Sequence, residues 1–389
     1  MKKKILLLAS WYPTTASPIG GIFVQDQARI LSRQYEVAVL APQLVPGNFR
    51  KAGPFTFSQE IEQDEALIVY RPRVPVPLPR PRALAFLFYL PVVKKSAAKL
   101  MAEWGQPDLI HAHVVLPGGW AAVQLGKRYS LPVVLTEHSS PFAMQLRRPY
   151  QRFLVRHTLA QMQQVIAVSP ALAQEIQDFF PAAPLVVAGN VIKTNFFVPP
   201  EIEKKSARGR TRFLSVALLS KQKGINYLLQ AGRLLLARGC TSFELTIGGD
   251  GPERTALERL AHDLGLGPHC RFLGMLAPHE VKNAMQQCDV FVMPSLHESF
   301  CIVLGEAMAC GKPVIATRCG GPEFVITPET GVLVEPANAA MLAEVMENFI
   351  THRAAYDAQQ VRQSVVRRFG EEAFLQNLAA VYERIWSKI

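Results

Sequence analysis

The chain has 389 residues and a formal net charge of +11 at pH 7, with 49% hydrophobic and 19% charged residues. This length predicts two or three domains with a large core, and the composition excludes a disordered or fibrous protein. The longest nearly apolar run, residues 83–93, contains Pro91 and falls short of the roughly 20 residues of a membrane-spanning helix.

Short β-branched runs alternate with helical patterns along the chain, which indicates parallel sheets covered by helices. In the first half we expect strands at 4–9, 36–41, 67–71, 108–113, 132–136, 164–168 and 185–188. The helices expected between these strands include 22–34, 117–129 and 150–162.

Residues 194–211 contain two prolines and a charged run, a composition typical of a linker. Beyond it we expect strands at 212–217, 243–248, 270–273, 289–293 and 313–317. The helices expected in this half are 224–238, 253–265, 278–287, 302–310, 338–350 and 371–387.

This alternation predicts an α/β protein with two doubly wound, Rossmann-like domains facing across a cleft. We expect the first domain to cover residues 1–195 and the second to cover 196–369, with a C-terminal helix, 370–389, packing back onto the first. In such sheets ligands bind beyond the carboxyl ends of the strands, so the loops that follow strands are the places to search for chemistry.

The N-terminal segment and the cysteines both favour a cytosolic protein. The start, MKKKILLLAS, resembles a secretion signal, but its apolar part is short and Trp-Tyr-Pro follows, so we expect a buried strand there. The six cysteines lie in the second half without a CxxC pair, which favours reduced thiols in a cytosolic protein.

Two glycine loops follow expected strands. The loop from Ser10 to Gly21 carries Gly20 and Gly21 before a helix, and Gly249 lies in the run GGDGP after the strand 243–248. Glycines at such positions let backbone N–H groups approach an anion at a helix N-terminus. Neither loop has the GxGxxG spacing of a dinucleotide site, and plain strand-to-helix turns remain an alternative.

The segment SLHESFCIVLGEAMACGKPVIAT contains the strongest pattern. Glu298 falls in the loop after a strand, and Glu306 falls on the second turn of the helix that follows. Unpaired amides at that helix start favour a diphosphate, and ionised carboxylates accept hydrogen bonds from sugar hydroxyls. The alternative is two solvated glutamates flanking a buried helix.

The segment ESFCIVLGE resembles the E-x7-E element of the retaining GT-B glycosyltransferases (glycosyltransferase family 4-like). Other segments resemble the same family: SWYP with GGIFVQDQ, HAHVVLPGG, TEH, GGDGP and RFLG. The first half resembles bacterial members that build exopolysaccharides or teichuronic-type polymers. This resemblance implies a GT-B fold with an acceptor-binding first domain and a nucleotide-sugar-binding second domain.

The resemblance also implies roles for residues of the E-x7-E segment. Glu306 would hold the ribose hydroxyls of a nucleotide-sugar, and Glu298 would contact hydroxyls of the transferred sugar. The backbone amides of Phe300, Cys301 and Ile302 would face sugar and phosphate.

Further roles follow from the same resemblance. Gly20 and Gly21 would close on the diphosphate, and Lys223 would neutralise it. Arg271 would border the base, and His138 would lie near the anomeric centre. The implied activity is retaining transfer of a hexose from a UDP- or GDP-sugar to a glycan or lipid-linked acceptor.

One departure from the family concerns phosphate binding. The family has an arginine where this chain has Leu218, and an aliphatic side chain makes no bidentate phosphate contact. Lys221 is expected to compensate as a point charge. A catalytically weakened GT-B partner protein, or an epimerase of the same fold, therefore remains an alternative to an active transferase.

No cofactor and no metal is expected. The chain lacks the D-x-D motif of metal-dependent glycosyltransferases, so Lys223, amides and the helix dipole would stabilise the leaving group. His111 and His113 invite the question of a metal, but we expect their side chains to point to opposite faces of the strand.

The basic charge is concentrated in the first half. Residues 66–102 and 139–174 contain no Asp or Glu, and Arg80, Arg82, Lys94, Lys95 and Lys99 flank the apolar run 83–89. Basic flanks around an apolar segment favour an interfacial helix on an anionic membrane surface, although solvated helix faces are the plainer alternative. No nucleic-acid-binding motif accompanies the charge, so we expect no nucleic acid partner and a peripheral place at the cytoplasmic face of the membrane.

Overall fold

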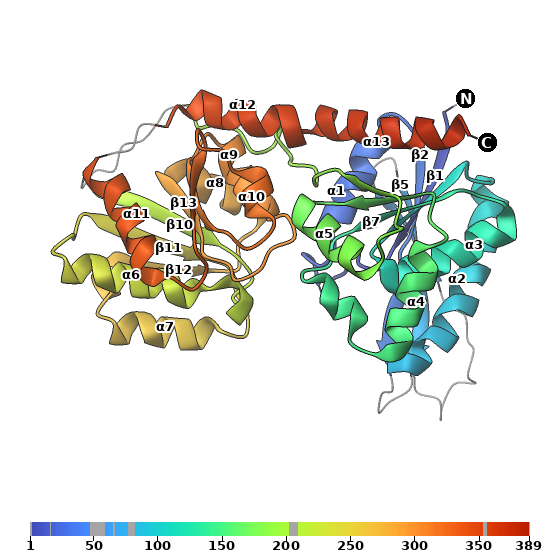
Figure 1. Ribbon diagram of the computed structural model, residues 1–389, viewed down its shortest axis with the longest axis horizontal. Coiled ribbons are helices and arrows are strands. Elements are labelled where there is room, and N and C mark those ends of the chain that lie inside the picture. The colour runs from blue at the N-terminus through green and yellow to red at the C-terminus, as the bar shows by residue number, and fades with distance from the viewer. Residues whose placement is uncertain are drawn as a thin grey trace. The chain divides into compact units, whose positions relative to one another are not determined.

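A computed structural model describes residues 2–15, 17–46, 59–64, 67–76, 82–201, 209–352 and 356–388, and the chain forms two compact units. The first unit consists of Met1–Val168, Leu172–Ala188 and Leu375–Ile389. The second consists of Ser169–Ala171 and Gly189–Phe374. Each unit contains one mainly parallel sheet with helices on both faces (Figure 1).

The sheet of the first unit has the strand order β3-β5-β2-β1-β6-β7-β8-β9, and β4 pairs antiparallel with β5. Its strands are β1 (Lys4–Ala9), β2 (Glu36–Leu40), β3 (Gln43–Pro46), β4 (Gln59–Asp64), β5 (Leu67–Val76), β6 (Leu109–His113), β7 (Val133–Glu137), β8 (Gln164–Ala167) and β9 (Leu185–Val187). Its helical segments are α1 (Ile22–Leu31), α2 (Arg82–Trp104), η1 (Val115–Gly119), α3 (Trp120–Tyr129), η2 (Phe142–Leu146), α4 (Pro149–Leu159), and most of α5 (Pro170–Phe179) and α13 (Glu371–Trp386).

The sheet of the second unit is wholly parallel in the order β12-β11-β10-β13-β14-β15. Its strands are β10 (Thr211–Val216), β11 (Phe243–Gly248), β12 (Cys270–Gly274), β13 (Val290–Met293), β14 (Val314–Thr317) and β15 (Gly331–Val334). Its helical segments are η3 (Lys221–Lys223), α6 (Ile225–Ala237), α7 (Arg254–Asp263), η4 (Gly267–His269), α8 (Pro278–Gln287), α9 (Ile302–Ala309), α10 (Pro322–Val325), α11 (Ala339–Thr351) and α12 (Ala358–Phe369).

The central strands are buried on both faces, which explains their continuous apolar sequences. In β1 the run Ile5–Leu8 is fully buried, as expected for a parallel strand covered by helices on each side. In the second unit α6, α7 and α11 form one hydrophobic core with the sheet, and α8, α9 and α12 cover the opposite face (Figure 1). The predicted α/β class is confirmed.

Several elements were not predicted from the sequence, namely β3, β4, β15, α5, α10 and α12. Helix α12 is rich in Gln and Arg, which hides a buried stripe of Val361, Val365 and Phe369 at helical spacing. The expected helix 117–129 begins only at Trp120, because the chain bends in Val115–Gly119, where Leu116 has an extended backbone conformation (φ −129°, ψ 136°).

The segment expected to be a linker is held firmly where it begins. The N–H and hydroxyl of Thr194 donate to the Glu371 carboxylate, the hydroxyl at 2.5 Å. Arg362 of α12 donates to the carbonyl oxygens of Thr194 and Phe197, both at 2.8 Å. Its composition is therefore that of a linker, but its first residues are part of the packed second unit.

Candidate functional site

Each unit has candidate binding loops where the strand order of its sheet reverses. In the first unit β1 lies between β2 and β6, and in the second unit β10 lies between β11 and β13. In open parallel sheets ligands bind beyond the carboxyl ends of the strands at such reversals. The loops after β1 and β10 carry Gly20, Gly21, Lys221 and Lys223, and the loop after β13 carries Glu298.

Two predicted residues, Lys223 and Glu298, meet directly in the second unit. The Lys223 Nζ lies 2.7 Å from Oε1 of Glu298, and the Ser295 hydroxyl donates to the same oxygen at 2.8 Å. Glu298 is only 7% exposed. Burial works against the Lys223 ammonium, but the Glu298 carboxylate outweighs it and raises the pKa of Lys223. Lys223 is therefore charged at neutral pH.

The start of helix α9 follows this pair and presents unpaired backbone donors. Cys301 precedes the helix with a positive φ of 73°, and Ile302 is its first residue. Within the described part of the chain, no acceptor receives the N–H groups of Phe300, Cys301 or Ile302. The Phe300 ring packs edge-on against Phe324 and Phe369, which fixes the backbone here. Such a helix start favours an anionic group.

Glu306 lies one turn further along the same helix. It follows Ile302 by four residues, so both side chains lie on one face of α9, while Leu304, Ala307 and Met308 are buried. Glu306 is half-buried. The helix thus carries a carboxylate close to its amide-lined start, and Glu298 stands on the other side of that start.

The glycine loop after β11 is a place of close backbone contact. The Gly249 N–H donates to the Gly274 carbonyl oxygen at 2.7 Å. Gly249 has φ of +116°, and a Cβ placed there would lie 1.9 Å from the Ala217 carbonyl oxygen. The ends of β10, β11 and β12 therefore touch at Gly249, and packing alone explains this glycine.

The remaining predicted residues of the second unit differ in their surroundings. Lys221 is exposed at the start of η3, and Leu218 is 49% exposed near it. Arg271 of β12 lies along the sheet, with its Nε 3.0 Å from both Glu244 Oε1 and Thr246 Oγ1. It lines a cavity of about 400 Å³ between the strands and α8.

In the first unit the glycine loop packs against its own start. Gly21 lies directly before α1, and a Cβ on it would lie 2.4 Å from the Trp11 carbonyl carbon. The Gly20 N–H donates to the Ser17 carbonyl oxygen at 3.2 Å. The Ser10 hydroxyl accepts the Gly118 N–H at 2.9 Å, which joins this loop to the turn after β6.

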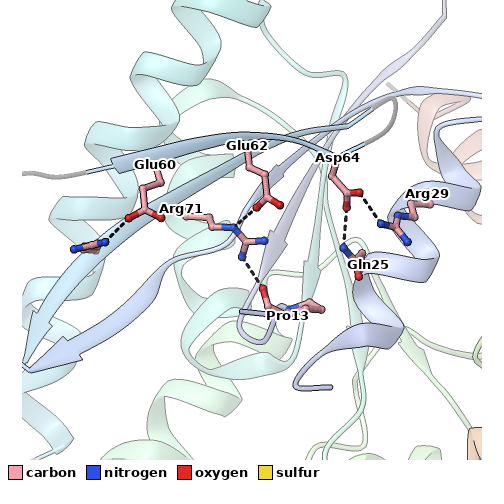
Figure 2. Close-up of polar contacts among 8 residues, drawn as sticks. Pro13, Gln25, Arg29, Glu60, Glu62, Asp64 and Arg71 are labelled. Carbon is pink, nitrogen blue, oxygen red and sulfur yellow. Dashed lines mark hydrogen bonds and ion pairs between the residues drawn. The ribbon is translucent and has the colours of Figure 1, made fainter. Parts of the chain in front are cut away.

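Arg71 of β5 anchors the same loop (Figure 2). Its Nη1 donates to the Pro13 carbonyl oxygen at 2.8 Å, and its Nε donates to Glu62 of β4 at 2.7 Å. The other contacts of this cluster join Arg73 to Glu60, and Asp64 to Gln25 and Arg29. The acidic strand β4 thus neutralises the arginines that hold the loop and α1.

His138 follows β7 and lies beside the glycine loop. Its ring centroid is 4.4 Å from that of Phe23 on α1, and its Nε2 is 3.0 Å from Nδ1 of His113. The buried Glu137 carboxylate accepts the N–H groups of His138 and Val115, at 2.9 and 2.7 Å. Burial raises the pKa of Glu137, although these N–H groups act in the opposite direction.

The expectation that His111 and His113 point to opposite faces is wrong. Their rings stack with centroids 4.6 Å apart, because alternate residues of a strand share one face. His111 is held by Tyr382 at 2.6 Å and Thr136 at 2.7 Å. No group of three or more potential metal-ligating residues occurs among the residues that the structure describes.

These buried histidines predict a loss of stability in acid. Burial lowers the pKa of His111 to about 3 and that of His113 well below its ordinary 6.5. A histidine with a depressed folded pKa stabilises the fold above pH 6.5, and this stabilisation is lost as the pH falls toward the folded pKa. Each of the two histidines would lower the free energy of unfolding by up to about 1.4 kcal/mol for every pH unit of acidification in that range.

The measurement is the melting temperature of the protein between pH 7 and pH 5. We expect His113→Asn to flatten this pH dependence and the exposed His262→Gln to leave it unchanged. Equal slopes for wild type and His113→Asn would contradict the assignment.

The structure therefore joins some predicted residues and adds others. It brings together Lys223 with Glu298, and His138 with the helix that follows Gly21. Sequence reasoning did not assign Ser295, Arg71 or the His113–His138 contact. Alternation along the strand could have placed His113 beside His111, whereas no local signal marks Arg71 as the anchor of Pro13.

Both halves of the chain match known sequence families. The family described as Glycosyl transferases group 1 matches residues 199–364, and Glycosyltransferase Family 4 matches residues 20–196. The D-inositol 3-phosphate glycosyltransferase of Streptosporangium roseum is 30% identical over 312 residues, covering 72% of this chain and 70% of that protein. The chain belongs to the group 1, family 4-like glycosyltransferases.

Other relatives and solved structures agree with this membership. TuaC of Bacillus subtilis, named for teichuronic acid biosynthesis, is 26% identical and aligns over 89% of each chain. Sucrose-phosphate synthase from Thermosynechococcus elongatus superposes with a TM-score of 0.82 at 23% identity, covering all of both chains. Anabaena Alr3699/HepE in complex with UDP superposes with a TM-score of 0.76 at 20% identity, covering 99% of this chain and 100% of that chain. The fold is GT-B, as predicted.

Proposed function

We propose that this chain is a retaining glycosyltransferase that moves a sugar from a nucleotide-diphosphate-sugar to a hydroxyl acceptor. The observation that carries the proposal is the Lys223–Glu298 pair beside the open amides at the start of α9. A cation, a helix start and two flanking carboxylates offer complementary groups for diphosphate and sugar hydroxyls. The acceptor class we propose is a lipid-linked or growing cell-surface polysaccharide.

Each residue has a proposed part in this reaction. Glu306 accepts hydrogen bonds from ribose hydroxyls, and Glu298 from hydroxyls of the sugar. Lys223 and the amides of Phe300 to Ile302 stabilise charge on the departing diphosphate, which is electrostatic preorganisation. His138 steadies the sugar. Proton transfer from the acceptor goes to the leaving phosphate on the same face, which retains the anomeric configuration.

Further predicted residues complete the proposed donor site. Gly20 and Gly21 close on the diphosphate, and Arg271 borders the base. Lys221 supports the diphosphate in place of the family arginine, since Leu218 has no polar group. We propose no cofactor and no metal requirement.

The nature of the donor is supported by solved relatives of the same fold. One structure of Anabaena Alr3699/HepE is a complex with UDP, and another is a complex with UDP-glucose. We propose a UDP- or GDP-sugar as the donor here. A weakened partner protein is the second candidate, because Leu218 leaves an exposed apolar side chain where the family has its phosphate-binding arginine.

A membrane surface is part of the proposal, because a lipid-linked acceptor lies at one. We propose peripheral attachment to an anionic membrane at its cytoplasmic face. In the described part of the chain, no helix combines the length and the apolar character needed to cross a bilayer. Arg80, one of the residues from which attachment was predicted, lies outside the described residues.

The test is a melting assay with UDP and GDP. We expect one of the two nucleotides to raise the melting temperature of the wild-type protein. Glu306→Ala is expected to abolish this rise, because the ribose hydroxyls lose their acceptor and the buried site is left with unpaired groups.

The matched control is Glu258→Ala, which removes an exposed glutamate from helix α7 of the same unit. This control should keep the full nucleotide-induced shift. An unchanged shift in Glu306→Ala, or no shift with either nucleotide in wild type, would overturn the proposed donor site.

A further inference from the structure

The surface formed by η2 and α4 in the first unit combines exposed apolar and cationic side chains. Phe153 is 70% exposed and Met144 is 46% exposed. The exposed residues Arg147 and Arg148 lie between η2 and α4, and the exposed Arg152 lies in α4; the three form no ion pair within the described residues. We name these five residues the arginine–phenylalanine surface.

The sequence of α4 turns this surface outward. Val155, Thr158 and Leu159 are the buried residues of α4. At 100° per residue, Phe153 points away from this buried stripe, and Arg152 lies along the edge of the stripe. A lone exposed apolar side chain needs no explanation, but a phenylalanine at the outer crest of an arginine-bearing helix marks an interaction surface.

The neighbouring helices extend the positive charge. Helix α3, which packs between α2 and α4, ends with Lys127 and Arg128, and α2 exposes Lys95 and Lys99. From residue 66 to residue 174 the sequence contains only three acidic residues, Glu103, Asp108 and Glu137.

None of the three offsets the arginines of α4. Glu103 accepts a hydrogen bond from Tyr70 and pairs with Lys99 of the same helix at 3.8 Å. Asp108 pairs with Lys3 at 2.7 Å, and Glu137 is fully buried. The helical layer α2–α3–α4 therefore carries a net positive charge, and Glu175 of α5 is an acidic neighbour that accepts the N–H of Phe142 in η2 at 2.8 Å.

We infer that the arginine–phenylalanine surface docks this chain on an anionic phospholipid bilayer. Guanidinium groups pair with lipid phosphates, while Phe153 and Met144 enter the boundary between head groups and acyl chains. The inference deepens the proposed function, on which it rests for the presence of a lipid-linked acceptor.

A nucleic acid or an acidic polysaccharide fits the same surface less well. Those polymers would pair with the arginines, but the thioether of Met144 offers them neither a charge nor a hydrogen-bond donor. One face of the Phe153 ring is already stacked on His157, at 6.3 Å between centroids and 15° between planes. That leaves less of the ring for base stacking, whereas insertion into lipid needs only its exposed edge.

The described part of helix α2 contributes charge to this layer. From Phe88 onward, where its side chains are described, Tyr89, Val93, Ala97 and Leu100 are buried in the unit. The side chains of residues 83–87, on which most of the predicted interfacial segment falls, lie outside those that the structure describes.

The experiment is flotation of the full chain with phosphatidylglycerol–phosphatidylcholine vesicles and with pure phosphatidylcholine vesicles at low ionic strength. We expect wild type to float only with the anionic vesicles. Arg147→Gln/Arg148→Gln/Arg152→Gln should weaken binding by roughly 100-fold, and Phe153→Ser by about 10-fold.

Two control variants match these changes in the second unit. Arg233→Gln/Arg259→Gln/Arg367→Gln removes the same charge from exposed positions, and Met275→Ser removes an exposed apolar side chain. Both should float like wild type. Failure of wild type to float, equal losses in the matched variants, or binding to dextran sulfate with the same dependence on Phe153 would overturn the inference.

The nucleotide melting assay on the same variants separates this inference from the proposed function. If nucleotides still raise the melting temperature but the protein does not float with anionic vesicles, only the proposed docking surface is refuted. If the protein floats but no nucleotide stabilises it, the docking surface is supported and the proposed donor site is refuted.

Discussion

Glu298→Gln is expected to lower the turnover number by about 10²- to 10³-fold, the range seen when one preorganised electrostatic contact is lost. Glutamine keeps the size of the side chain and an oxygen for the Ser295 hydroxyl. It does not neutralise Lys223, whose Nζ lies 2.7 Å from the carboxylate. The ammonium loses its orientation, and the sugar loses a charged acceptor for its hydroxyls.

The measurement is kcat and KM for the nucleotide-sugar that the wild-type protein uses. We expect most of the loss in kcat, because the proposed contact acts on the reacting sugar. Glu335→Gln is the control, since Glu335 also pairs with a cationic side chain, Arg318 at 3.5 Å, but on the exposed surface. A Glu298→Gln protein with turnover within threefold of wild type would refute the assignment.

Gly224→Ala is expected to destabilise the second unit by about 3–5 kcal/mol, at the extreme of single substitutions. Gly224 follows Lys223 with φ of +65°, and a Cβ there would lie 2.0 Å from the Pro294 carbonyl oxygen. The clash forces η3 away from the loop after β13. That loop is joined to η3 by the Leu296 N–H, which donates to the Gln222 carbonyl oxygen at 2.8 Å.

The matched control is Gly265→Ala. Gly265 has nearly the same φ, +71°, but nothing lies within 4 Å of its added Cβ. The Gly265→Ala substitution should therefore lower the free energy of unfolding only by the penalty for a left-handed backbone conformation, about 1–2 kcal/mol. Melting temperatures and urea midpoints of the two variants report the difference. Equal destabilisation would show that backbone conformation, rather than contact with Pro294, fixes glycine at 224.

Much of the fold could be predicted because local periodicity encodes it. KILLLA and FELTIG coincide with β1 and β11, and the helix expected at 278–287 coincides with α8. Helix α12 was hidden by polar residues around a narrow apolar stripe. It is stabilised by burial against the rest of its unit rather than by its own sequence.

The candidate site was predictable only in part, for the same physical reason. The order of strand, loop, Glu298, helix and Glu306 is local, so the segment 290–309 could be placed correctly from its sequence. A resemblance to a known family supplied the roles. Contacts between distant residues had no such signal.

The sequence by itself determined the parallel α/β alternation, the strand-to-helix turn that carries the two glutamates, and the excess of basic residues in the first half. Only the tertiary structure decided which side chains meet. Lys223 and Glu298 are 75 residues apart, and they pair because β10 and β13 are neighbours in the sheet. Arg71 of β5 reaches Pro13, 58 residues away in the loop after β1, although β2 lies between β5 and β1 in the sheet. Strand order depends on the packing of the whole unit, and no local pattern encodes it.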